Sequence, residues 1–120
     1  MHDEQNVTPV RQKVLAALEP YVASHAQDAQ AAARLGTLEA WSGNREKALR
    51  YTDAALTVAA KDPYVLLEAA ETYDRLGDRK KALEYAHQSI QNGYTLADLQ
   101  GRPGTQALAA DPTLSKDSKK

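Results

Sequence analysis

The chain repeats a nine-residue block after 34 positions, and this repeat limits its possible folds more than any other feature. Residues 43–51 read Gly-Asn-Arg-Glu-Lys-Ala-Leu-Arg-Tyr and residues 77–85 read Gly-Asp-Arg-Lys-Lys-Ala-Leu-Glu-Tyr, so six of nine positions are identical. Repeats of this length are typical of architectures in which each unit buries the apolar face of the next. We therefore divide the chain into two full units, residues 29–62 and 63–96, preceded by half a unit at residues 9–27. The half unit keeps the register at Arg11, Lys13 and Leu15.

Each unit is predicted to be a pair of helices joined by a glycine turn. In the second unit, apolar residues recur three, four and seven positions apart within residues 66–73, the spacing of one helix face. We expect Asp62 to cap this helix, with Pro63 in the first helical position. Gly77 should end it, and Asp78 should cap the next helix. Small residues should let the helix backbones approach closely at four positions: Gly36, Ala48, Ala70 and Ala82.

On these residues the chain resembles the tetratricopeptide repeat family, whose unit is a helix pair with a period of 34. Leu35 and Gly36 match the family's Leu-Gly pair, Tyr73 matches its tyrosine, and Ala48 and Ala82 match its signature alanine. The resemblance implies an all-α fold, a right-handed helical solenoid of about two and a half repeats with helical caps. The units depart from the family pattern at the tryptophan positions, held by Ala32 and Leu66, and at the first tyrosine position, held by Glu39.

The N-terminal flank is predicted to supply one further helix. We expect residues 1–8 to be disordered and residues 9–27 to form a capping helix or half repeat, with Thr8 as its N-cap. Pro20 interrupts the apolar stripe of this helix. Because proline removes a backbone donor and crowds the preceding turn, we expect a kink or break near residues 18–19.

The C-terminal flank is predicted to close the solenoid as a cap over residues 97–114. Residues 95–98 have the pattern of a short capped helix, residues 101–104 that of a loop, and residues 105–110 that of a second helical turn. The polar residues 115–120 are expected to be a disordered tail. Two segments, residues 92–96 and 108–112, resemble the closing part of tetratricopeptide regions in bacterial proteins.

The composition argues against several classes of protein. The 120 residues carry 15 Lys and Arg against 16 Asp and Glu, a net charge of −1, and include no cysteine. The sequence therefore lacks the basic excess that non-specific nucleic-acid binding needs. It also lacks the cysteines that disulfides and zinc ribbons require. The polar N-terminus does not resemble a secretory leader, and no stretch approaches the ~20 apolar residues of a membrane helix. We expect a cytoplasmic protein that binds neither nucleic acid nor membrane.

Residues suited to catalysis or metal binding form no recognisable pattern. The histidines His2, His25 and His87 lie far apart, and no acid–histidine–serine order or paired ligand spacing accompanies them. Residues 101–104 lack the Gly-Lys-Ser/Thr ending of a phosphate-binding loop. His87 is expected on a solvated helix face. We therefore expect a protein that is not an enzyme, with no catalytic residues, no metal site and no cofactor.

The resemblance also implies where a partner would bind. In the family, the first helix of each unit lines a concave groove, and tryptophan, tyrosine and arginine are typical of the residues that dominate binding energy. Trp41 has two interpretations, in the groove or packed under the N-terminal helix, and both stay open. Ala33 and Thr37 replace the lysine and asparagine with which some members hold a chaperone's C-terminal carboxylate, so that role is not expected. The groove positions are Gln30, Ala33, Thr37, Ala40 and Trp41 in the first unit and Tyr64, Leu67, Glu71, Asp74 and Arg75 in the second.

We therefore predict a non-catalytic protein–protein interaction module that binds a peptide or helix of a partner in this groove. Because Glu71 and Asp74 stand beside Arg75, we expect a partner of mixed rather than purely acidic charge. A monomer is favoured over a homo-oligomer. Two alternatives stay open: self-association through apolar edges of the end helices, and a regulatory appendage of a signalling enzyme.

Overall fold

The structure is a computed structural model that describes residues 3–114, with side chains from Val10 onward. Within this part of the chain every regular element is helical and no strand occurs, so the predicted all-α class is confirmed. None of these helices has both the length and the apolar character that a membrane crossing requires. The predicted tail, residues 115–120, lies outside the described residues. In chain order the elements are α1 (Asp3–Ser24), α2 (Ala29–Trp41), α3 (Arg45–Val58), α4 (Pro63–Arg75), α5 (Arg79–Gln91), α6 (Leu96–Gln100), the 3₁₀ helix η1 (Pro103–Thr105) and α7 (Gln106–Ala109).

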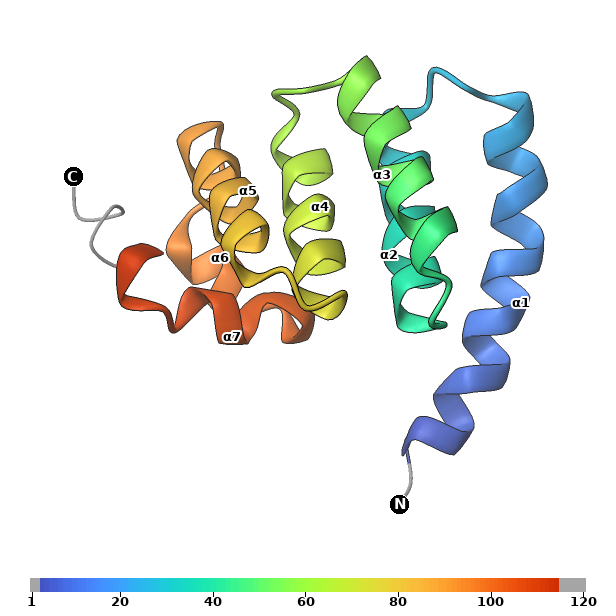
Figure 1. The fold of residues 1–120 in the computed structure, drawn as a ribbon, viewed down its shortest axis with the longest axis horizontal. Helices are drawn as coiled ribbons and strands as arrows, with labels where there is room; N and C mark the ends of the chain where they lie inside the picture. The colour runs from blue at the N-terminus through green and yellow to red at the C-terminus, as the bar shows by residue number, and fades with distance from the viewer. Residues whose placement is uncertain (1–2, 115–120) are drawn as a thin grey trace.

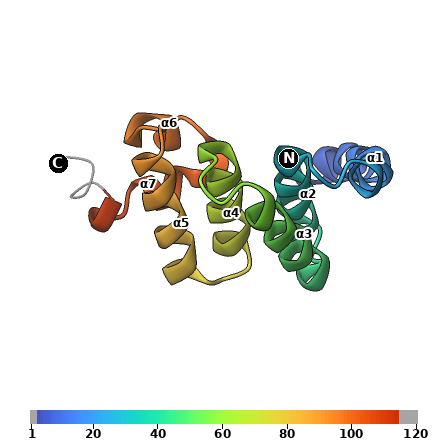
Figure 2. The same ribbon diagram turned by 90° about the horizontal axis from the view of Figure 1, so that it is seen from above.

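The long helices are arranged so that the first helices of the two sequence units are neighbours. α2 packs against α3 and α4 packs against α5, as expected for two helix pairs, and α2 also packs against α4. α1 lies against α2 at one end of the molecule, and the short C-terminal helices lie at the other end (Figure 1). Seen from above, α1 and the α5–α7 region lie at opposite sides of the molecule (Figure 2). The groove described below runs over α2 and α4.

α4 and α5 begin at the predicted residues, each after an aspartate N-cap. The Asp62 carboxylate accepts a hydrogen bond from the backbone N–H of Tyr64 at 2.8 Å, and Pro63 is the first residue of α4. Asp78 does the same for α5, accepting from the N–H of Lys81 at 3.1 Å. These carboxylates satisfy backbone donors that a helix start leaves without an intrahelical partner.

Both helix pairs turn through a glycine in a left-handed conformation. Gly43 has a φ of 85° and Gly77 a φ of 91°, which side chains with a Cβ rarely adopt. This geometry lets each turn close with a backbone hydrogen bond between residues five positions apart, which is typical of helix ends. The residue after the glycine donates its N–H to a carbonyl in the last helical turn, from Asn44 to Glu39 and from Asp78 to Tyr73, both at 2.9 Å.

Small residues bring the paired helices close together, as predicted. A Cβ added to Gly36 would lie 2.5 Å from Thr52 Oγ1 and 3.1 Å from the Ala48 carbonyl oxygen, so a larger residue would push α2 away from α3. Ala70 and Ala82, which stand 34 positions after Gly36 and Ala48, are fully buried in the second pair. The same close contact therefore occurs in both units.

The N-terminal helix differs from the sequence prediction in two ways. α1 begins at Asp3 rather than after Thr8, and it continues through Pro20 without the break expected at residues 18–19. Pro20 is exposed, as is Ala16, whose carbonyl loses its usual helical partner, so water can reach this carbonyl. The Ser24 hydroxyl in turn donates to the Pro20 carbonyl at 3.1 Å.

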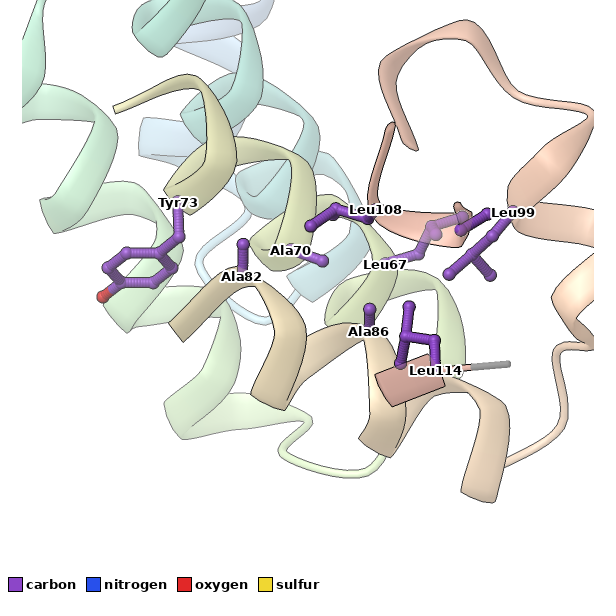
Figure 3. Packing of buried hydrophobic residues seen from close by; sticks show 9 residues of the cluster. Leu67, Ala70, Tyr73, Ala82, Ala86, Leu99, Leu108 and Leu114 are labelled. Carbon is purple, nitrogen blue, oxygen red and sulfur yellow. The ribbon is translucent and has the colours of Figure 1, made fainter. Parts of the chain in front are cut away.

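The C-terminal segment, for which a cap over residues 97–114 is predicted, shares a hydrophobic core with α4 and α5. α6 begins with a reciprocal cap, in which the Thr95 N–H donates to Asp98 at 2.8 Å and the Asp98 N–H donates to Thr95 at 3.1 Å. Pro103 and Gly104, predicted to lie in a loop, belong instead to η1. In Figure 3, leucines of the cap gather around Leu67 of α4. The buried members of this core are Leu67, Ala70, Tyr73, Ala82, Ala86, Leu99, Leu108, Ala109 and Leu114.

Glu39 of α2 carries a buried carboxyl group. Asn44 Nδ2 donates to Glu39 Oε1 at 2.7 Å. Nearby, Glu19 of α1 forms an ion pair with Lys47 of α3 at 3.3 Å. Burial raises the pKa of Glu39, the Asn44 hydrogen bond opposes this, and the neighbouring Glu19 carboxylate adds to the rise. Glu39 therefore favours its protonated form more than an exposed glutamate does.

Replacing Gly77 should destabilise the fold through backbone strain alone. No atom lies within 4 Å of the position that a Cβ would occupy there, so Gly77→Ala should cost about 1–2 kcal/mol from the left-handed conformation. Gly101→Ala is a matched control, because Gly101 has a φ of −81° and its nearest neighbour, the Ala97 carbonyl oxygen, would be 3.5 Å away. Urea unfolding measures both. Equal losses would contradict the assignment.

Replacing Glu39 should remove a pH dependence of stability. Its raised folded-state pKa means that the unfolded chain loses this proton first, so the free energy of unfolding falls as pH rises from about 4.3 through the folded pKa. In Glu39→Gln the amide oxygen can still accept from Asn44, but position 39 no longer titrates. The free energy of unfolding of the variant, relative to that of the parent, should therefore increase from about pH 4 to about pH 7. Urea unfolding at both pH values tests this, with exposed Glu46→Gln as the control. A pH-independent loss in Glu39→Gln would refute it.

Candidate functional site

Two adjoining cavities form a groove along α2 and α4. The tryptophan cavity, of about 460 Å³, is lined by α1, α2, α4 and η1, and the glutamate cavity, of about 550 Å³, is lined by α2, α4, η1 and the residue before η1. Four residues line both cavities and make the groove continuous: Arg34, Glu71, Pro103 and Gly104. The tryptophan cavity is also lined by Val10, Arg11, Val14, Thr37, Leu38 and Trp41, and the glutamate cavity by Tyr64, Glu68 and Arg102.

A buried polar contact joins α2 to α4 beneath this groove. The Thr37 hydroxyl donates to Glu68 Oε1 at 2.6 Å, and Thr37 and Thr72 share a hydrogen bond at 3.0 Å. All three residues are almost completely buried. Because a buried carboxylate is costly without partners, the position of α2 against α4 is tied to this contact.

Arg102 attaches the C-terminal segment to the same carboxylate. Its Nη2 lies 2.9 Å from Glu68 Oε1 and 2.8 Å from Glu71 Oε1, and its Nε donates to Glu71 at 3.1 Å. Burial lowers the pKa of the Arg102 guanidinium, but the two carboxylates together outweigh burial and raise it. We call Glu68, Glu71 and Arg102 the carboxylate latch, because they hold the segment that contains η1 against α4.

Gly104 is close to the latch for a steric reason. A Cβ on Gly104 would overlap the carboxylate of Glu71. Only glycine therefore lets the backbone of η1 lie this near to α4 without moving Glu71. The glycine-rich segment, predicted only as a loop, forms part of the groove wall.

Two residues extend the polar surface of the groove from the latch. Arg34 Nη1 lies 3.6 Å from Glu68 Oε2, and 46% of the Arg34 side chain is exposed. Tyr64 is half-buried, and burial together with a hydrogen bond to Glu68 raises the pKa of its hydroxyl. The tyrosine is thus a neutral donor and the arginine a charged donor at the groove surface.

Trp41 stands on the wall of the tryptophan cavity rather than in the core. The residue is 37% exposed, and its Nε1 donates to Glu71 Oε2 at 2.9 Å. The Arg75 guanidinium carbon lies 4.0 Å from the ring centroid and that of Arg11 lies 5.9 Å from it. Arg11 also donates to the Trp41 carbonyl at 3.1 Å, so α1 contacts the tryptophan without covering it. Both interpretations of Trp41 are therefore partly correct.

The predicted groove residues lie in three different environments. Thr37, Trp41, Tyr64 and Glu71 line the cavities, and Arg75 packs on Trp41. Gln30 donates to Asp62 at 3.0 Å, and Asp74 forms an ion pair with Arg79 at 3.2 Å, so both are engaged outside the cavity linings. The remaining three are buried between helices: Ala33, Ala40 and Leu67.

The burial of these three residues corrects their predicted place on an open surface. Leu67 is covered by Leu99 and Leu108, because the C-terminal segment folds back over α4 (Figure 3). Ala33 and Ala40 are covered because α2 packs against neighbours on several sides. Positions taken from a repeat pattern do not include contacts that a flanking segment adds. His87, expected to be solvated, is half-buried on α5.

The charged part of the groove was not predicted from the sequence. Arg34 and Glu68 stand next to predicted positions on the same helices, and a wider helix face would have included them. Arg102 gave no comparable signal, because its contact with Glu71 joins residues 31 positions apart. Val10 and Val14 of α1 were not expected in the groove, because the angle between α1 and α2 depends on tertiary packing rather than on neighbouring residues in the sequence.

The groove is suited to non-covalent recognition. Among the residues that the structure describes, no group of three or more His, Cys, Asp or Glu side chains could hold a metal ion. Guanidinium donors, a neutral hydroxyl and exposed apolar surface stand side by side in the groove. Comparison with protein-family models, curated proteins and solved structures found no match to this chain. The function is therefore inferred from the geometry of the groove.

Removing the cation of the latch should destabilise the protein and show coupling to its carboxylates. Arg102→Met leaves the buried Glu68 carboxylate with Arg34, at 3.6 Å, as its remaining cationic partner, at a cost of about 3 kcal/mol. Adding Glu68→Gln removes the uncompensated charge, so the double variant should be more stable than the sum of the single changes predicts. Urea unfolding of the parent, the two single variants and the double variant gives the coupling free energy between Arg102 and Glu68. Additive effects would contradict a latch.

Arg79→Met is the matched control for this cycle. Arg79 pairs with Asp74 on the surface, where 49% of the arginine side chain is exposed. Exposed ion pairs contribute about 0–1 kcal/mol, so this variant should remain close to the parent.

Proposed function

We propose that the chain is a tetratricopeptide-like helical module that binds a peptide or helix of a partner protein in the groove over α2 and α4. The 34-residue repeat, the two glycine turns and the pairing of α2 with α3 and of α4 with α5 support this assignment. The role of the chain is then binding rather than catalysis.

The observation that most supports binding is the continuous pair of cavities with aromatic side chains in each. Trp41 stands in one cavity and Tyr64 in the other, and such side chains dominate many interfaces. The Thr37–Glu68 contact and the latch fix the groove walls before a partner arrives. A preformed site loses little conformational entropy on binding, so more of the contact energy appears as affinity.

Self-association is a second candidate because α1 exposes apolar side chains. Val10 is 61% exposed, Val14 42% and Tyr21 41%. A second copy could cover this surface, and its apolar burial would drive pairing. Tyr21 does not line the groove, so it separates the two candidates.

Matched aromatic substitutions test the groove against self-association. Peptides selected from a random library for binding to the protein are titrated calorimetrically against the parent, Trp41→Ala and Tyr21→Ala. Groove binding predicts at least about tenfold weaker binding for Trp41→Ala and little change for Tyr21→Ala. Circular dichroism checks that each variant is folded, and sedimentation measures mass against concentration. A concentration-dependent dimer lost in Tyr21→Ala, with no peptide binding dependent on Trp41, would replace the groove proposal.

A further inference from the structure

On the basis of the proposed groove function, we infer that the partner segment is an acidic–apolar peptide, in which carboxylates flank a large aliphatic or aromatic side chain. The apolar side chain would enter the tryptophan cavity, and the carboxylates would bind Arg11 and Arg34 at its walls. This names the chemistry of the partner, which the groove shape alone does not.

Positive charge is in excess around the tryptophan cavity, although the whole chain has a net charge of −1. The groove and the Trp41 ring are contacted by four arginines, and the carboxylates that line the groove are Glu68 and Glu71. Both carboxylates are bound by Arg102 in the latch. The four arginines are Arg11, Arg34, Arg75 and Arg102.

The acidic residues that suggested a partner of mixed charge are already engaged within the protein. Glu71 accepts from Arg102 and from the Trp41 indole, and Asp74 pairs with Arg79. Within the described part of the chain, no ion pair involves Arg11 or Arg75, which lie against the Trp41 ring. Cations beside an aromatic face can still bind an anion, so charge complementarity favours a carboxylate-bearing partner.

Arg34 and Arg11 are placed to receive carboxylates at the cavity wall. Both line the tryptophan cavity, from α2 and α1 respectively. Nearly half of the Arg34 side chain is exposed, and its contact with Glu68 is long at 3.6 Å. The exposed Arg34 guanidinium can form two parallel hydrogen bonds with a partner carboxylate and give up only its long contact with Glu68.

The tryptophan cavity that these arginines line also has apolar walls. Val10, Val14, Leu38 and Trp41 contribute to its lining, and the two valines are exposed. A large apolar side chain inserted here would remove both valines from water, which stabilises the complex in proportion to the area buried. Cationic and apolar side chains line the same cavity, so a fitting segment carries acidic and apolar residues close together.

The test is a selection followed by binding measurements on defined peptides. Random twelve-residue peptides displayed on phage are selected on the parent protein, and those lost on Trp41→Ala are retained. We expect these to carry Leu, Ile or Phe with Asp or Glu within three positions. The strongest peptide is synthesised with a fluorophore and measured by anisotropy, together with a version in which the apolar residue is Ala and one in which the acids are Asn or Gln.

Each substitution should weaken binding by about tenfold or more. The protein variant Arg11→Gln/Arg34→Gln should reduce the affinity of the acidic peptide by a similar factor and change that of the Asn/Gln peptide little. Arg50→Gln is the control, because Arg50 packs on Tyr51 of α3 outside the groove. Circular dichroism confirms that all variants are folded.

The remaining outcomes separate this inference from the groove proposal. Selected peptides that depend on Trp41 but are basic or uncharged would overturn the inference and leave the groove function standing. Equal binding by the version with Ala at the apolar position, with competition by a single-stranded oligonucleotide, would show recognition of polyanions and overturn it. If no peptide depends on Trp41, the groove function fails as well.

Discussion

The buried carboxylate of Glu68 is the contact on which the rest of the groove depends. It accepts from Thr37 of α2 and from Arg102 of the C-terminal segment, so a single side chain fixes two neighbours of α4. Taking a carboxylate out of water costs free energy, and its partners offset that cost only in one geometry. The Glu68 carboxylate therefore contributes less to stability than to determining how α2, α4 and the C-terminal segment pack together. This packing sets the positions of the groove walls.

Apolar packing and polar contacts have separate roles in this small protein. Alanines and a glycine set the separation within each helix pair, and leucines of the C-terminal cap complete the second core. These contacts are non-directional, so they allow a helix to slide or rotate by small amounts. The hydrogen-bonded carboxylates of α4, Glu68 and Glu71, remove that freedom. The groove walls are thus held by directional contacts as well as by apolar packing.

The sequence was informative wherever structure is determined by neighbours in the chain. The N-caps at Asp62 and Asp78 and the turn at Gly77 were predicted correctly, because each depends on residues within a few positions. The path of α1 through Pro20 was not predicted, since it depends on which side of the helix meets water. Arg102 could not be assigned to the groove, because only the tertiary fold brings it to Glu68. The candidate site was therefore predicted for its aromatic residues and missed for most of its charges.

The position of Trp41 has a practical consequence for how the protein can be observed. It is the single tryptophan of the chain, and its indole N–H is held by Glu71 while a guanidinium lies over its ring. Indole emission responds to the polarity and charge of its surroundings, and here those surroundings are the wall of one cavity. The protein thus carries an intrinsic optical reporter of whether that cavity is filled with water or with another molecule. Occupancy can be followed without attaching any label to the chain.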